Sequence, residues 1–456
     1  MAEKIVVKSL GLKRFNALAA RSRSPAAAYV SEEIGWFSNE VETVIGVLLK
    51  DTVDNDYAAV VLGRDEGGAF RAFDQAASFP TQEEAGLWLE GAIRWHTGRG
   101  KSVFPQGDTK ERIDLFAPVV PIARQHPYFV KLAGEPSFLP ARSIINEMMP
   151  HFIDIDGNFV EQFQSTGFDA RLWELYVDAY LVEEQLFINR DHSAPDFLVV
   201  KYGKSVAIEA VIVGRKVDNP PVYFKFSDDP AIADVTSDKR QDDMAVKFGS
   251  PLYTKLQKRY WTLDHVKGNP LIIAVADFHD DKSMLWSGTA LLSYLYGVKH
   301  EFRHDERGQL IISPLKIASH KVGSKEIASG FFFQKDAENI SAVLFSASGT
   351  ISKFNRIGRQ SGYMHPDVTM IRIGTCHDHD PNAALPKMFQ YTVDESRSET
   401  WSEGLSMFHN PQALYPVPEE LFPSIAHHRF VDGQIVSHVP EFHPYSSFTI
   451  NLRKTR

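Results

Sequence analysis

The sequence predicts a mixed α/β protein, α+β overall, that folds into more than one structural unit. The chain has 456 residues, a length that suggests about three domains. Apolar residues make up 43% of it and charged residues 23%, proportions that are typical of globular proteins with large cores. Between residues 161 and 360, helical periodicity alternates with short β-branched runs, which predicts a mixed central sheet flanked by helices.

Cysteine usage and charge narrow the classes of protein. The single cysteine, Cys376, excludes an internal disulfide and is typical of a reducing compartment. We expect a cytoplasmic protein without a membrane partner, because no apolar run approaches the length of a signal peptide core or a bilayer span. The net charge of −9 disfavours general coating of nucleic acid but allows a local basic groove. A homodimer is compatible with the sequence.

Residues 1–100 are expected to form a small α+β domain, a three-stranded meander followed by a helix. Thr81 and Glu84 form a capping box, which predicts the start of that helix, and Gly98 predicts its end. The expected strands are separated by polar turns and cover Val41–Lys50, Tyr57–Gly63 and Ala69–Phe73.

Residues 101–160 are expected to be a linker with one short helix, Pro140–Met149. Two acidic turns, Asp51–Asp56 and Asp154–Gly157, contain part of a calcium-loop pattern. Both lack the remaining ligands of an EF-hand loop, so we interpret them as solvated turns.

Residues 161–360 are expected to form the main core. The apolar surface of the segment Phe168–Phe187 predicts a helix that is buried on most faces. A hairpin should follow, because the apolar runs Phe197–Val200 and Ser205–Val213 flank a short turn that contains Gly203. The later elements are expected to be a helix Leu252–Trp261 that starts at Ser250 and Pro251, a strand Leu271–Ala276, a helix Ser287–Tyr296 and a strand Ser341–Phe345.

Two further segments lack long periodic patterns. Asp218–Asp238 is rich in proline and aspartate and is long enough to be a functional loop or lid. Residues 361–456 are expected to form a loop-rich C-terminal subdomain that packs on the core, since apolar residues continue to the end.

Each run of the predicted hairpin carries one carboxylate in an apolar setting. Asp196 directly precedes the first run, and Glu209 lies inside the second. Burying a carboxylate is costly unless a cation or a metal ion compensates, so these two residues suggest a site. Glu174, in the preceding helix, is either a water-facing glutamate at the helix edge or a third acid aimed at the same place.

This arrangement resembles the PD-(D/E)xK nuclease superfamily, which has the restriction-endonuclease-like fold. The resemblance covers roughly Phe168–Phe278 and rests on Pro195-Asp196, on Glu209 thirteen residues later, and on Glu174 in the helix before. It implies that the three carboxylates bind Mg²⁺ or Mn²⁺. Such an ion polarises a phosphoryl oxygen and generates hydroxide for in-line attack.

The sequence departs from this pattern at the lysine. Residues i and i+2 share a strand face, and the residue two positions after Glu209 is Val211. In some members of the superfamily a neighbouring helix supplies the lysine. Lys255 in the predicted helix Leu252–Trp261 is therefore our candidate, with Lys247 as second choice, although either lysine could belong to a solvated helix face.

Other motifs compete less well. His365-Pro366-Asp367 is a second P-D before an apolar run, but that run contains no acid, and we interpret it as a decoy. The segment Cys376–Asp380 has metal-ligand residue types, yet the spacing of His377 and His379 is not typical of zinc sites, which favours a solvated loop. His427-His428 is weaker still.

Three hypotheses follow. The leading one is a Mg²⁺-dependent nuclease that hydrolyses DNA, with Asp196 and Glu209 as metal ligands, Glu174 as outer or third ligand and Lys255 as the charge-stabilising residue. Defence against foreign DNA is the setting that the superfamily suggests. The second is a catalytically inactive, nuclease-like module that binds nucleic acid or protein, and its motivation is the valine at the lysine position. The third is a hydrolase with a metal ion at the histidines of the segment 376–380.

Overall fold

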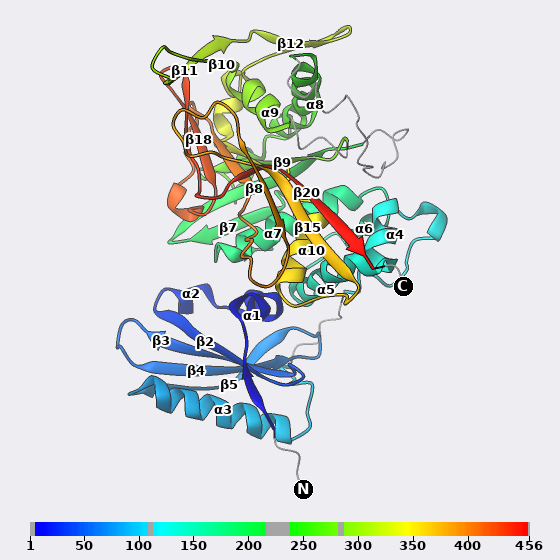
Figure 1. Cartoon of the computed structure of the whole chain (residues 1–456), viewed down its shortest axis with the longest axis vertical. Helices are drawn as coiled ribbons and strands as arrows, with labels where there is room; N and C mark the ends of the chain where they lie inside the picture. Colours follow the sequence, from blue (N-terminus) through cyan, green and yellow to red (C-terminus); the bar gives the residue numbers. More distant parts are fainter. Residues whose placement is uncertain (1–4, 108–112, 216–237, 281–286, 455–456) are drawn as a thin grey trace.

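The computed structural model describes residues 5–107, 113–215, 238–280 and 287–454 and has a mixed α and β architecture, which confirms the broad fold class (Figure 1). An N-terminal sheet with its helix lies at one end, and a larger body built on an eight-stranded sheet lies beside it. Residues 218–237, the greater part of the expected loop or lid, fall outside the described residues. No described helix is both long enough and apolar enough to cross a membrane.

The N-terminal sheet is antiparallel and has five strands in chain order. Helix α3 (Gln82–Gly98) packs on one face, and Thr81 caps it by accepting the backbone N–H of Glu84 at 3.2 Å, as the capping box predicts. Helix α1 (Leu12–Ala19) covers the other face and lies between this sheet and the larger body (Figure 1). The strands are β1 (Val7–Ser9), β2 (Ser31–Asn39), β3 (Val44–Asp51), β4 (Tyr57–Arg64) and β5 (Phe70–Phe79).

The first two strands of this sheet were not predicted. Strand β1 has three residues, which is too short for a periodic signal, and the pairing of β2 with β3 shifts register between Glu33 and Gly35. A bulge breaks the alternation of apolar and polar residues that identifies a strand.

The two acidic turns use their carboxylates to hold their own backbone. Asp51 accepts the N–H groups of Val53 and Asp54 at 2.7 and 3.1 Å. Asp154 accepts the N–H groups of Gly157 and Phe159, at 2.9 Å each. These are local turns of the kind that aspartate favours.

Along the chain, the N-terminal sheet is followed by helices α4 (Pro127–Gly134), α5 (Leu139–Met148) and α6 (Phe159–Gln164). Helix α5 was expected, and the other two were not. All three contribute buried residues to the core beneath helix α7 (Phe168–Glu183), which is buried on most faces as predicted.

The central sheet is mixed, in the order β19-β18-β17-β14-β9-β8-β7-β6. Strands β8, β9 and β14 are parallel to one another, while β6, β7 and β8 form an antiparallel meander. The strands are β6 (Phe187–Asn189), β7 (Phe197–Lys201), β8 (Lys204–Val213), β9 (Leu271–Asp277), β14 (Ala342–Ser346), β17 (Leu405–His409), β18 (Ala426–Val431) and β19 (Gln434–His438).

Strand β9 separates two hydrophobic cores. Its seven residues are all buried, and alternate side chains enter opposite cores. The core on one side includes α7, and the core on the other includes α8 (Asp238–Gln257) and α9 (Ser287–Tyr296). The prediction of a strand buried on both faces is confirmed, and so is the prediction of helix α9 with its end at Tyr296.

The predicted hairpin is present as β7 and β8. A two-residue turn joins them, with positive φ at Tyr202 (53°) and Gly203 (73°), which is the type I′ geometry that matches the twist of hairpin strands. Phe197 is paired with Ile208, so the preceding residue, Asp196, comes beside Glu209. The turn therefore sets the register that brings the two carboxylates together.

Helix α8 begins earlier than the sequence suggested. Pro251 lies inside this helix rather than at its first position, and the helix ends at Gln257 rather than Trp261. A proline removes one helical hydrogen bond. The helix nevertheless continues, because buried apolar residues recur at helical spacing on both sides of the proline: Met244, Phe248, Leu252 and Leu256.

The C-terminal region has more regular structure than the expected loop-rich subdomain. It supplies β17, β18 and β19 to the central sheet and forms a second sheet of β16 (Lys387–Thr392), β15 (Val368–Cys376) and β20 (Pro444–Arg453). Most of these strands have five or six residues and alternate with polar, proline-rich connections, so their periodicity is hard to detect. The polar insertion after α9 likewise forms two hairpins, β10–β11 (Val298–His304 and Leu310–Lys316) and β12–β13 (Ser319–Val322 and Lys325–Ala328).

Candidate active site

Asp196 and Glu209 lie side by side at the start of β7 and in the middle of β8. The backbone N–H of Asp196 donates to Oε2 of Glu209 at 3.2 Å, and the N–H of Ala210 donates to Oδ2 of Asp196 at 2.7 Å. These reciprocal bonds fix the two carboxylates relative to each other. Within the described parts of the chain, hydrogen bonds engage Oδ2 of Asp196 and leave Oδ1 for a further ligand.

A lysine from α8 completes this pair. The ammonium of Lys255 forms an ion pair with Oε1 of Glu209, and the hydroxyl of Tyr260 donates to the same oxygen at 2.7 Å. The Glu209 side chain is 6% exposed and the Lys255 side chain 22% exposed, so the lysine reaches inward from the surface. Lys247, the second choice, pairs instead with Asp243 one helical turn away. Val211 packs against the core that includes α8.

Glu174 approaches the pair from α7 but is held by an arginine. Arg171 Nη1 donates to both of its carboxylate oxygens, at 3.1 and 2.8 Å. The side chain of Glu174 is 19% exposed, so it does not simply face water. Glu174, Asp196 and Glu209 are not among the described groups whose three ligand atoms all lie within 4.8 Å of one another.

The electrostatics of the site reflect burial and neighbouring charges. Burial raises the pKa of Asp196 to about 7, and the charges of Glu209 and Glu174 act in the same direction. Burial also raises the pKa of Glu174, although Arg171 opposes that change. Three carboxylates thus lie near three cations: Lys255, which acts on Asp196, and Arg171 and Arg190, which act on Glu174.

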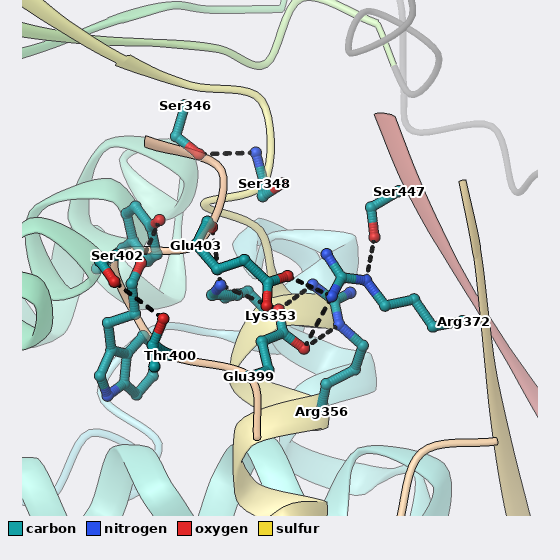
Figure 2. A network of polar contacts seen from close by, with 12 residues as sticks. Ser346, Ser348, Lys353, Arg356, Arg372, Glu399, Thr400, Ser402, Glu403 and Ser447 are labelled. Carbon is teal, nitrogen blue, oxygen red and sulfur yellow. Dashed lines mark hydrogen bonds and ion pairs between the residues drawn. The ribbon is translucent and has the colours of Figure 1, made fainter. Parts of the chain in front are cut away.

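A second buried ionic cluster has the opposite balance (Figure 2). Glu399 contacts Arg356 at 2.7 Å, Lys353 at 3.0 Å and Arg372 at 3.5 Å, and all four side chains are at most 1% exposed. Although burial alone would raise it, these cations hold the pKa of Glu399 far below its ordinary value. Glu403 also pairs with Arg372. The cluster joins α10 (Ile351–Gln360) to the second sheet and is closed to solvent, so it is structural.

Two cavities differ in their position relative to this site. A cavity of about 770 Å³ lies between the N-terminal sheet and the body, is lined by residues such as Phe15, Trp36 and Met148, and does not include Asp196, Glu209 or Lys255. A smaller hollow of about 520 Å³ lies at the C-terminal end of β8 and along α8, with Lys247 and His279 in its lining. This hollow is lined by other residues of β8 and α8, the elements that carry Glu209 and Lys255, and its lining does not include either of those two residues or Asp196.

The other sequence candidates lie elsewhere. The second P-D, with Asp367, precedes β15 in the three-stranded sheet rather than the central one. His377 contacts the hydroxyl of Tyr445 at 2.8 Å, and His379 contacts the carbonyl oxygen of Glu441 at 3.0 Å, both at the surface.

A histidine–glutamate group that the sequence analysis did not assemble lies at the end of β17. His409, Glu419 and His427 bring their ligand atoms within 4.8 Å of one another. Eighteen residues separate the two histidines, and without knowledge that β17 and β18 are adjacent no sequence spacing would identify the group.

No protein-family model matches the chain, and no curated protein and no solved structure is significantly similar to it. The functional interpretation therefore depends on the geometry and chemistry of the site.

Proposed function

We propose that this protein is a metal-dependent nuclease that hydrolyses DNA phosphodiester bonds at Asp196, Glu209 and Lys255. The observation that carries the proposal is the contact of Lys255 with Glu209, directly beside Asp196. In β8 the usual position of the lysine is occupied by Val211. Lys255 of α8 supplies the ammonium group instead. A restriction-endonuclease-like core is part of the proposal, and the order α7, β6–β7–β8, α8, β9 with β8 parallel to β9 supports it.

The residues present fit a hard divalent cation. Oδ1 of Asp196 and the carboxylate of Glu209 would hold Mg²⁺ or Mn²⁺, and Glu174 would act from outside through water. When bound, the ion would polarise the scissile phosphate and lower the pKa of a coordinated water. Asp196 must release its proton to bind the ion. Lys255, whose ammonium has three N–H donors of which one is engaged by Glu209, stabilises the negative charge that develops on the phosphate.

We propose that a substrate approaches over the hollow that other residues of β8 and α8 line. Lys247 and His279 line it, and the side chain of Lys247 is 26% exposed. With a net charge of −9, the protein must rely on local lysine and arginine side chains to bind a polyanion. We therefore expect binding to weaken steeply as salt concentration rises.

The competing hypothesis of a catalytically inactive binding module was motivated by Val211. Lys255 removes that motivation, since an ammonium group stands beside Glu209 without a lysine on β8. The test below decides between the two functions.

The purified protein should be incubated with supercoiled and linear DNA in Mg²⁺ or Mn²⁺, with a chelator as the blank. We expect metal-dependent cleavage, reduced at least about 100-fold by Asp196→Asn, Glu209→Gln or Lys255→Met, since each removes several kcal/mol of transition-state stabilisation. The matched control is Asp367→Asn, which changes the second P-D and should leave the rate unchanged.

Two outcomes would contradict the proposal. If the wild-type protein binds DNA but never cleaves it with either metal ion, the binding module is correct. If Asp196→Asn cleaves as fast as the wild type, the active site is wrongly assigned.

A further inference from the structure

Three side chains meet where the connection between β17 and β18 returns to the sheet. His409 is the last residue of β17, Glu419 opens the short helix η10 (Glu419–Leu421), and His427 is the second residue of β18. His409 Nε2 lies 2.9 Å from His427 Nδ1 and 3.7 Å from Glu419 Oε1. Ligand atoms around a tetrahedral zinc ion are about 3.3 Å apart. The spacing therefore fits a metal ion after small side-chain adjustments.

The hydrogen bonds around His427 orient it as a metal ligand. Its Nε2 lies 2.9 Å from the carbonyl oxygen of Phe422, which can only accept, so Nε2 carries the proton. Nδ1 is then the atom with the lone pair, and it faces His409. Metal-binding histidines commonly donate their other ring N–H to a backbone carbonyl in this way.

The surroundings of both histidines favour the neutral form. Burial lowers the pKa of His409 to about 3, with contributions from His427 and Arg429, and burial lowers the pKa of His427 as well. His409 needs only the tautomer that places its proton on Nδ1.

Glu419, the third side chain of the group, already pairs with an arginine. Glu419 forms an ion pair with Arg429 of β18, and the two side chains are 39% and 41% exposed. Ion pairs this exposed contribute little to stability. Glu419 can therefore exchange the arginine for a metal ion at small cost, and Arg429 becomes a competitor of that ion.

We propose that His409, Glu419 and His427 bind a divalent transition-metal ion of the zinc type. Two imidazoles and one carboxylate suit zinc, whereas Mg²⁺ prefers oxygen ligands alone. The site is separate from the proposed active site, since β18 and β8 are four strand positions apart, about 19 Å. A metal ion here would fix the crossover between the parallel strands β17 and β18.

The test uses Zn²⁺ as the probe on full-length protein freed of metal with a chelator. Calorimetric titration should show uptake of one ion by this site, and Co²⁺ in its place should give the visible absorption of a tetrahedral complex. Glu419→Gln should lower the affinity at least about tenfold. Arg429→Gln should raise it, because the competing cation is removed, an effect that a purely structural role of the cluster would not produce.

The controls address other sources of zinc binding. His379→Gln changes an exposed histidine elsewhere, and Asp196→Asn changes the proposed active site, so both should leave this uptake unchanged. Glu419 and Arg429 lie at the surface, so the test remains valid if variants of the buried His427 fail to fold. The proposal is overturned if the wild type takes up no Zn²⁺, if Glu419→Gln binds as tightly as the wild type, or if His379→Gln loses the ion.

Discussion

Two buried ionic clusters in this protein are built from the same residue types and behave in opposite ways. Around Glu399 there are three cations, and the pKa of its carboxyl group is lowered despite complete burial. Around Asp196 there are two further carboxylates, and burial raises its pKa to about 7. Burial acts in the same direction in both places, so the neighbouring charges decide the outcome.

The comparison separates structure from function. The Glu399 cluster surrounds a fully buried carboxylate with cations and is closed to solvent, so it can stabilise the fold but cannot bind a substrate. The Asp196 cluster raises the pKa of its carboxyl group instead of lowering it, and it reaches the surface through Lys255, whose side chain is 22% exposed. A buried carboxyl group with a strongly raised pKa is a candidate functional group, and we propose a divalent cation as its ligand.

The largest expected effect on stability comes from removing the carboxylate of the Glu399 cluster. Glu399→Gln leaves Lys353, Arg356 and Arg372 buried without their shared counter-ion, which should lower the free energy of unfolding by about 3–5 kcal/mol. The measurement is urea-induced unfolding at pH 7. The same change at the other cluster, Glu209→Gln, should destabilise far less, and equal losses at the two positions would refute the contrast.

Neutralising Asp196 should stabilise the protein instead of destabilising it. Asp196→Asn removes a buried charge that two neighbouring carboxylates repel, while the amide oxygen can still accept the N–H of Ala210. At pH 8 it should raise the free energy of unfolding by about 1–3 kcal/mol. Denaturation of the two proteins side by side tests this, and a destabilised variant would contradict it.

The pH dependence of these two variants should diverge. The raised pKa of Asp196 gives stability that is present below its unfolded value of 3.8 and is lost as pH rises to about 7, so the advantage of Asp196→Asn should grow across that range. The lowered pKa of Glu399 gives stability that is present above 4.5 and is lost as pH falls, so the deficit of Glu399→Gln should shrink below pH 4.5. Unfolding midpoints from pH 3.5 to 8 measure both trends. Parallel curves for the two variants would contradict the account.

The smallest effect concerns the hydroxyl that shares Glu209 with Lys255. Tyr260→Phe removes one hydrogen bond of 2.7 Å to the carboxylate and should cost about 1 kcal/mol. Lys255 should remain in place, so metal-dependent cleavage should persist. Loss of cleavage comparable to that of Lys255→Met would mean that the tyrosine, rather than the lysine, completes the site.

Local patterns were enough to predict the elements that carry the candidate site. The apolar run after Pro195 and the glycine turn located β7 and β8, and the absence of a lysine at position 211 directed attention to α8. The start of α8 was predicted wrongly, because the sequence signal at Ser250 and Pro251 resembles a helix start whereas the packing of the whole apolar stripe decides the outcome.

Contacts between distant parts of the chain could not be predicted. The Glu399 cluster joins residues 353, 356, 372 and 399, and the group around His409 joins two strands and a loop, without a shared local pattern. Both groups can be identified only when the order of the strands in the sheets is known. Charged residues in a region that looks irregular gave no sign that they would be fully buried.

The central claim is that the carboxylates at Asp196 and Glu209 require a divalent cation. The most direct measurement is the thermal unfolding midpoint during a Mg²⁺ titration at pH 6 and pH 8, with monovalent salt held at equal ionic strength. We expect Mg²⁺ to stabilise the wild type, by about 2.7 kcal/mol at a concentration 100 times the dissociation constant, with tighter binding at pH 8 because Asp196 has then lost its proton. Asp196→Asn should not respond. The account is contradicted if Mg²⁺ has no effect on the wild type beyond that of the salt, or if it stabilises Asp196→Asn equally.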